Sequence, residues 1–167
     1  TTLDLSGAVF EKNGMTITGA VVTAYGTFYR AVFPSLMTLV LSGTVFAVGE
    51  MTTSGDVFTA YYTFNSAVFS SLTTLDLSGV KFAIVGMTMS VHVCTAYYTF
   101  EYAAIRRLSS LSLPPDQQNQ TWTDTFKDSD YPNTGGTVHW SEYDSTTPNR
   151  PNSWTTTWFQ NWDWSAQ

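Results

Sequence analysis

The chain has 167 residues, a formal net charge of −6 and an isoelectric point near 4.5, and only 12% of its residues are charged. This length predicts one domain, or one domain with an appendage, and is sufficient to bury a hydrophobic core. The acidic balance excludes a general binder of phosphate backbones, so nucleic acid is not expected as a partner. A membrane span is not expected either, because no stretch approaches the roughly 18 consecutive apolar residues that it requires.

The composition favours β-structure. The chain holds 27 threonines against 7 lysines and arginines, and 16% of its residues are aromatic. Threonine and aromatic side chains are enriched in strands, and so few cations are unusual for a cytosolic enzyme. The single cysteine, Cys94, excludes a disulfide within the chain and any multi-cysteine metal site.

A 36-residue repeat dominates residues 1–113. The recurring segment is TTLDLSG at Thr1 and Thr73, MTLVLSG at Met37 and, in degenerate form, SSLSLPP at Ser109. The three full units align without a gap and are identical at sixteen positions; they are residues 1–36, 37–72 and 73–108. Gapless repetition predicts a repeat solenoid of three stacked coils followed by a fourth strand.

Each unit opens on an alternating segment that predicts a half-buried strand. In the third unit Leu75 and Leu77 would face the core, while Thr74 and Asp76 would face outward. We expect parallel strands at Leu3–Leu5, Leu39–Leu41 and Leu75–Leu77, and a fourth near Leu111–Leu113.

A turn-prone stretch and then a short extended run, such as Val57–Thr59, follow in each unit. This run predicts a loop or a short second strand. Next, Ala60, Phe64 and Ala67 fall at helical spacing behind Thr59, which is placed as an N-cap. We therefore expect short helices at about 24–33, 60–70 and 96–107, the first ended by Pro34.

The strand segments resemble the leucine-rich repeats of BspA-like bacterial surface proteins. The residues that carry the resemblance are Leu36-Met-Thr-Leu39-Val-Leu41 and Leu72-Thr-Thr-Leu75-Asp-Leu77, each preceded by an Ala-aromatic segment ending in PSL or SSL. The repeat is longer than the usual 20–29 residues, and the usual Asn or Cys is replaced. The replacing residues are Thr44, Val80 and Asp116. The resemblance implies a leucine-rich-repeat-like coil with one parallel strand and one short helix, in a secreted or surface-anchored, non-catalytic bacterial protein used for adhesion or recognition.

Residues 114–167 form a different, acidic segment without the 36-residue period. Turn signals and alternating runs predict a Trp-rich β cap or β module. All the tryptophans lie here, namely Trp122, Trp140, Trp154, Trp158, Trp162 and Trp164. Their indoles would either stack on sugar rings, contact a protein partner, or seal the end of the solenoid.

The outward face of the predicted sheet is a second candidate binding surface. It carries short polar side chains, including Thr38, Thr74 and Asp76. Partners of repeat proteins bind such faces, although an exposed polar face also serves solubility alone.

Sites for a metal or for catalysis are weakly indicated. Asp128, Asp130 and Asn133 place oxygen ligands close together, but the run lacks the glycine and closing glutamate of a Ca²⁺ loop, so a solvated turn is the alternative and no metal is predicted. Neither His92 nor His139 belongs to a catalytic motif.

We expect no cofactor and no enzymatic activity. Hydrolysis of a glycan, the alternative, would need a pair of carboxylates, such as Asp128 with Glu142 or Asp144. The aligned positions of Cys94 are apolar, which predicts a small buried side chain there. A glycosylation sequon begins at Asn119.

These patterns together predict a non-catalytic extracellular or cell-surface module for adhesion or recognition, with a protein or glycan as partner. The flank of the first coil, with Leu3, Leu5, Phe10 and Phe28, would face solvent, and solenoids need terminal caps. We therefore expect that a preceding part of a longer protein covers it, or that a second copy does. In the second case the chain would be a structural subunit of an extracellular filament that assembles head-to-tail.

Overall fold

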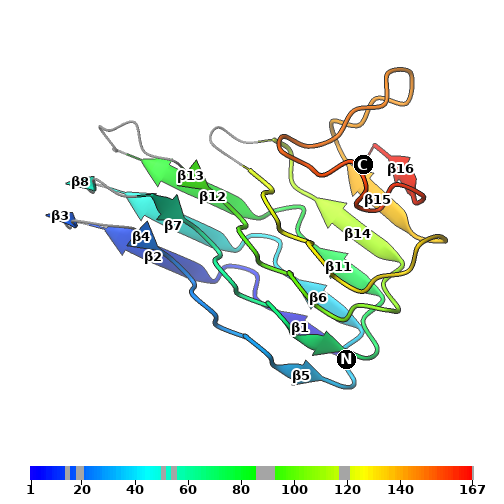
Figure 1. Cartoon of the computed structure of the whole chain (residues 1–167), viewed down its shortest axis with the longest axis horizontal. Helices are drawn as coiled ribbons and strands as arrows, with labels where there is room; N and C mark the ends of the chain where they lie inside the picture. Colours follow the sequence, from blue (N-terminus) through cyan, green and yellow to red (C-terminus); the bar gives the residue numbers. More distant parts are fainter. Residues whose placement is uncertain are drawn as a thin grey trace.

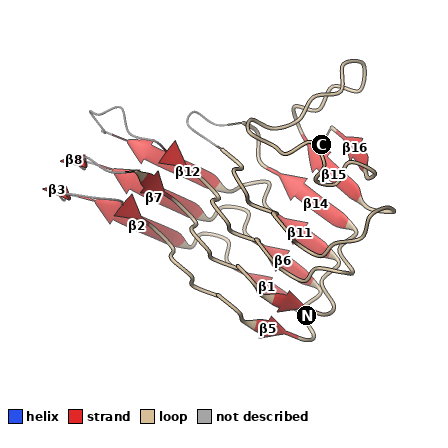
Figure 2. Ribbon diagram, viewed as in Figure 1, coloured by secondary structure: helices blue, strands red, loops and turns tan. Residues whose placement is uncertain are grey.

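The computed structural model describes residues 1–13, 16–17, 21–49, 52–53, 56–85, 93–116 and 121–166. Within these ranges the chain forms sixteen strands in five sheets, and the strand pairs are parallel (Figure 2). Strands from successive repeats lie one above another, in order from the N-terminal to the C-terminal end (Figure 1). The described residues include no helix long and apolar enough to cross a membrane.

The largest sheet has six strands in the order β1-β6-β11-β14-β15-β16. Leu3 pairs with Leu39, Leu39 with Leu75, and Leu75 with Leu111. This confirms the predicted parallel strands and their register. The bounds are β1 Thr2–Asp4, β6 Thr38–Val40, β11 Thr74–Asp76, β14 Ser110–Leu113, β15 Thr137–Trp140 and β16 Asp163–Ser165.

Four smaller sheets hold the remaining strands in the same parallel register. Two of them have three strands: β2 Val9–Asn13 with β7 Val45–Gly49 and β12 Lys81–Val85, and β4 Val21–Val22 with β9 Val57–Phe58 and β13 Val93–Cys94. Two have two strands: β3 Thr16–Ile17 with β8 Thr52–Thr53, and β5 Val32–Phe33 with β10 Val68–Phe69. The extended run predicted at Val57–Thr59 is therefore a short strand, β9. The strands β2, β7 and β12 were not predicted, because their residues differ between the repeats.

The predicted helices at 24–33, 60–70 and 96–107 are wrong, and a solenoid with one short helix per coil is not what the chain forms. These segments contain positive-φ residues, for example Ala60, Tyr62 and Ser66 at 52°, 56° and 57°. Such residues lie in the left-handed region, which a right-handed helix does not contain. The segments instead form tight turns with hydrogen bonds from residue i+3 to residue i, as from Asn65 N to Tyr62 O.

We call the stacked segments 23–31, 59–67, 95–103 and 121–129 the turn ribbon. Alternate N–H groups of one repeat donate to carbonyls of the next: Tyr62 N to Tyr97 O, and Phe64 N to Thr99 O. Buried backbone groups must be paired, and here the neighbouring repeat supplies the partners that a helix would supply internally. The helical spacing of the apolar residues is real, but pairing between repeats determines the backbone.

Threonine side chains fasten the turn ribbon. The hydroxyl of Thr63 donates to the carbonyl of Ala24 at 3.0 Å, and the hydroxyl of Thr99 donates to the carbonyl of Ala60 at 2.8 Å. Thr125 repeats the contact. These threonines are buried, so their hydroxyls satisfy carbonyls that water does not reach.

Aromatic rings stack through the core in the same register. Phe28 stacks on Phe64 with ring centroids 4.9 Å apart, Phe64 on Phe100 at 5.2 Å, and Phe100 on Phe126 at 5.3 Å. With the buried leucines of the six-stranded sheet they form a core shared by all repeats.

The Trp-rich segment continues the stack rather than standing apart from it. β15 and β16 extend the six-stranded sheet, and Phe126 N-terminal to them extends the phenylalanine column. The spacing between stacked positions is shorter here, 26 residues for His139 and Ser165. Gly136 lies against the Trp162 indole, where an added Cβ would overlap the ring.

A threonine hydroxyl in the turn ribbon should contribute measurably to stability. Thr99→Val keeps the shape of the side chain but leaves the Ala60 carbonyl without this donor, so we expect a loss of about 1–2 kcal/mol in the free energy of unfolding. Thr156→Val, at an exposed threonine, is the control. Urea denaturation measures both, and equal effects of the two variants would contradict the role of the hydroxyl.

Candidate functional site

A hollow lies on the outer face of the turn ribbon. Its volume is about 550 Å³, and we call it the tyrosine groove. It is lined by Tyr25, Gly26, Tyr29, Arg30, Tyr62, Asn65, Ser66, Glu101 and Tyr102. Three full repeats therefore contribute to it.

The groove exists because the middle repeat carries small side chains where its neighbours carry large ones. Ser66 occupies the position that is Arg30 in the first repeat and Tyr102 in the third, as the hydrogen bonds Arg30 N to Asn65 O and Ser66 N to Glu101 O establish. A short hydroxyl between two large side chains leaves a hollow between them.

Tyrosine rings form the rim of the groove. Tyr25, Tyr29 and Tyr102 are 69%, 48% and 56% exposed. Tyr62 packs against Tyr98 in a stack with ring centroids 5.2 Å apart and an angle of 14° between the planes. Burial raises the pKa of the Tyr62 hydroxyl, and a hydrogen bond with Tyr61 raises it further.

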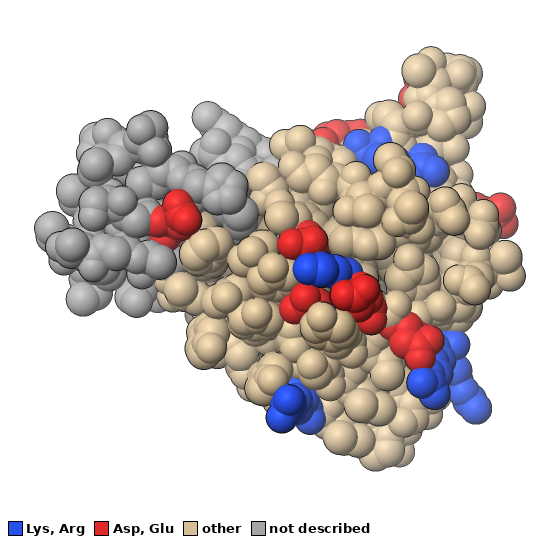
Figure 3. Space-filling view, viewed as in Figure 1, with Lys and Arg blue, Asp and Glu red and all other residues tan. Residues whose placement is uncertain are grey.

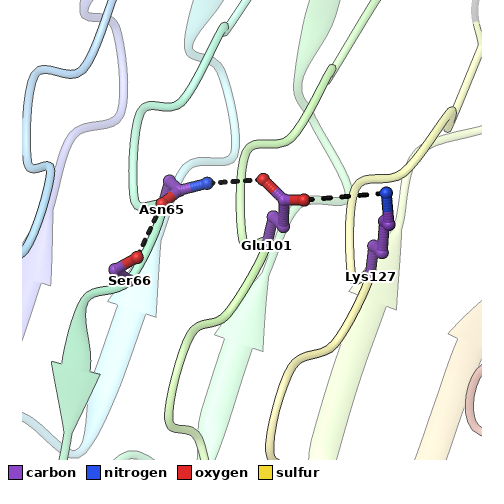
Figure 4. Close-up of polar contacts among 4 residues, drawn as sticks. All are labelled: Asn65, Ser66, Glu101 and Lys127. Atoms are coloured by element: carbon purple, nitrogen blue, oxygen red, sulfur yellow. Dashed lines mark hydrogen bonds and ion pairs between the residues drawn. The ribbon is translucent and has the colours of Figure 1, made fainter.

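A row of polar side chains forms the floor (Figure 4). Asn65 Nδ2 donates to Glu101 Oε2 at 2.8 Å, and the hydroxyl of Ser66 donates to Asn65 Oδ1 at 2.7 Å. Lys127 Nζ lies 3.9 Å from Glu101 Oε1. Asn65 and Glu101 are buried, at 3% and 5% exposure, so the row is held in a fixed geometry by its own hydrogen bonds.

Burial is the largest electrostatic influence on the carboxylate in the floor. Burial raises the pKa of Glu101, while the hydrogen bond from Asn65 and the charge of Lys127 act in the opposite direction. The carboxylate of Asp124 is the largest cause that raises the pKa of Lys127. Acidic and basic side chains lie next to one another near the middle of the view in Figure 3, as they do at two places nearer its edge.

The tryptophans lie mostly in the core. Trp122, Trp140, Trp154, Trp158 and Trp162 are between 1% and 7% exposed. The partly buried Trp164 has the Arg150 guanidinium 4.0 Å from its ring centroid. These positions leave little indole surface for a sugar or a protein partner, and they agree with the alternative in which the indoles close the end of the stack.

The sheet-face candidates lie side by side but present little to a ligand. Thr38 and Thr74 pair across β6 and β11, and both are half-buried. Asp76 Oδ1 accepts hydrogen bonds from the backbone N–H and the hydroxyl of Ser78. Its carboxylate therefore stabilises the turn after β11.

The metal and catalytic candidates do not converge. Asp130 pairs with Arg106, while Asp128 and Asn133 are exposed. Over the described ranges no three His, Cys, Asp or Glu side chains are placed to hold a metal. Two hydrogen bonds from Thr146 lower the pKa of Asp144, the reverse of what a general acid needs.

Among the other residues singled out in the sequence, the side chain of His139 is described, whereas those of three more are not. His139 Nδ1 lies 3.0 Å from the Ser165 hydroxyl, within the sheet. Cys94 belongs to β13, but its side chain lies outside the described ones. His92 and Asn119 lie outside the described residues altogether.

Sequence reasoning missed the tyrosine groove. The sequence feature that could have revealed it is variation at two equivalent positions of otherwise similar repeats. One position is Tyr29, Asn65 and Glu101 in the three repeats, and the next is Arg30, Ser66 and Tyr102. Assigning these residues to helices separated them from one another. Comparisons of the chain with family models, with curated proteins and with solved structures found no match.

The buried carboxylate should make stability depend on pH. Because burial raises the pKa of Glu101 in the folded state, the unfolded chain loses its proton first as the pH rises past about 4.3, and folding stability falls until the raised pKa is passed. Glu101→Gln keeps an acceptor for Asn65 and removes the titration. We expect the free energy of unfolding of the variant, relative to the unmodified protein, to increase over this window and then level off.

Urea denaturation at a series of pH values measures this difference, with Glu142→Gln at an exposed side chain as the control. A difference between Glu101→Gln and the unmodified protein that is constant with pH would contradict a desolvated carboxylate at position 101.

Proposed function

We propose that this chain is a non-catalytic recognition module of an extracellular or cell-surface protein, and that it binds its ligand in the tyrosine groove. The observation that carries the proposal is an open hollow of about 550 Å³ with exposed tyrosine rings around a polar floor. Pockets of this volume accept small ligands or part of a larger one. Tyrosine supplies rigid, amphipathic contact area at a low cost in side-chain entropy.

A recognition role is favoured over catalysis by the state of the groove's carboxylate. Glu101 is the one carboxylate among the residues that line the groove, and it is engaged by Asn65 and Lys127. Acid-base chemistry on a glycoside needs two carboxyl groups flanking the bond. The extracellular placement rests on the composition, which is poor in lysine and rich in threonine and aromatic residues.

Filling the groove should abolish binding without unfolding the protein. Ser66 has a φ of 57°, and the equivalent Arg30 and Tyr102 adopt 58° and 55°, so a large side chain is compatible with this backbone. We expect Ser66→Tyr to weaken binding by at least about tenfold, the loss of 1.4 kcal/mol or more of contact energy. Surface plasmon resonance over immobilised polysaccharides and purified extracellular matrix proteins measures it.

Ser153→Tyr is the matched control, because Ser153 is exposed, has a φ of 61° and lies outside the groove. Binding that survives Ser66→Tyr for every retained ligand, or no retention on any surface, would contradict the proposal. Thermal denaturation of both variants verifies that they fold.

A second candidate function, self-assembly, is favoured by the edge formed by the first repeat. β1, β2, β4 and β5 each lie at the end of their sheet. Val9, Val32 and Met37 near this edge are 58%, 64% and 51% exposed. An unpaired strand edge is a template for another chain, and a second copy would offer strands of the same type.

Light scattering over a range of protein concentrations tests this candidate. Assembly predicts a mass that grows with concentration and that falls to the monomer in Val9→Lys, because a lysine on an edge strand opposes pairing. A concentration-independent monomer would exclude it.

A further inference from the structure

The column of tyrosines on the turn ribbon is interrupted beside the groove. Tyr98 and Tyr62 occupy one position in the third and second repeats and stack on each other. The same position in the first repeat is Gly26, which has no ring. A Cβ added there would meet only the Cβ of Tyr29 at 3.6 Å, so the space beside the backbone is open.

The rings that surround this space stand at steep angles to Tyr62. Tyr25 lies with its centroid 6.3 Å from that of Tyr62 and an angle of 78° between the planes, and Tyr29 lies at 6.5 Å and 65°. They form side walls and are not stacked on Tyr62. The column thus ends at a position that carries no ring, which lines the groove next to two tyrosine side chains.

The other side of the groove offers hydrogen bonds that suit hydroxyl groups. Ser66 and Asn65 supply a hydroxyl and an amide, Glu101 supplies carboxylate oxygens, and Arg30 supplies a guanidinium near the rim. A pyranose ring has apolar C–H faces and hydroxyls around its edge. An aromatic wall next to a polar floor is complementary to both features.

The charges of the groove favour a neutral ligand. Glu101 already accepts a hydrogen bond from Asn65 and has Lys127 as a counter-charge, and the Arg30 guanidinium lies 5.1 Å from the Tyr29 ring centroid. A cationic peptide side chain would meet this arginine at the rim, although tyrosine faces attract cations. An anionic ligand would meet Glu101. An apolar peptide anchor would remove water from the polar row and form no hydrogen bond to it, which costs free energy.

Resting on the proposed recognition function, we infer that the ligand of the tyrosine groove is a neutral oligosaccharide, one pyranose ring of which lies beside Gly26 and stacks on Tyr62. The groove volume of about 550 Å³ is in the range that accepts a ligand the size of a di- or trisaccharide. The rest of the sugar lies over Ser66 and Asn65, toward Tyr102.

The experiment uses the whole chain and a panel of neutral trisaccharides: cellotriose, maltotriose, mannotriose and N,N′,N″-triacetylchitotriose. Isothermal titration calorimetry measures affinity, and saturation-transfer NMR from the tyrosine protons measures contact with the sugar C–H groups. We expect at least one trisaccharide to bind at millimolar concentration or below, with saturation transfer to one ring face.

Gly26→Tyr is the decisive variant because it completes the tyrosine column and fills the inferred ring position. Tyr62 and Tyr98 adopt φ values of 56° and 53°, close to the 58° of Gly26, so both equivalent positions carry tyrosine on this backbone, and thermal denaturation verifies that the variant folds. We expect at least a tenfold loss of affinity. Gly26→Ala changes the same backbone position but leaves the space open, so it should keep affinity within about threefold.

The outcomes separate the inference from the recognition function. If no trisaccharide binds, or if Gly26→Tyr binds as well as the unmodified protein, the inference is wrong. If, in addition, Ser66→Tyr still loses retention on a protein surface, the groove recognises protein and the recognition function stands. If Ser66→Tyr changes binding to no surface, both are wrong.

Discussion

Parallel pairing between equivalent positions of successive repeats is the constraint on which the structure depends. Each repeat leaves backbone groups that only the next repeat can satisfy, both in the strands and in the turn ribbon. Exact register follows, because a shifted repeat would separate Phe64 from Phe100 and the Thr99 hydroxyl from the Ala60 carbonyl. Side chains that face the core must therefore be of the same type in each repeat. In agreement, the sixteen positions that are identical in the three units include those of Leu3, Thr27 and Phe28.

The same constraint leaves the outward positions of the turn ribbon free to vary. One such column reads Tyr29, Asn65, Glu101 and Lys127, and hydrogen bonds and an ion pair link its polar members across the repeats. Stacking places these unlike side chains next to one another at the spacing between paired strands, about 4.8 Å. A binding site can thus arise from substitutions along a column, without any change in the backbone that carries it.

This division explains how much could be predicted from the sequence. The alternation of apolar and polar residues around Leu39 and Leu75 predicted the strands. The gapless 36-residue period predicted their parallel pairing and their register. The helices were wrong because Ala60, Phe64 and Ala67 bury the same side chains in a helix and in a turn ribbon. What separates the two is the left-handed backbone at Tyr62 and Ser66, for which neither residue has a strong preference. The groove depends on that backbone and could not be predicted without it.

The Trp-rich segment contributes to the candidate site even though its composition sets it apart. Lys127 belongs to the fourth layer of the turn ribbon and reaches Glu101 in the third. A carboxylate at 5% exposure with no nearby cation would be costly to ionise, so this layer allows an acid in the groove floor. Phe126 holds Lys127 in register by continuing the phenylalanine column, and Trp154 and Trp158 pack against Phe126 from the C-terminal side. The buried indoles therefore act on the groove through the stack, because they pack against the layer that carries the counter-charge of Glu101.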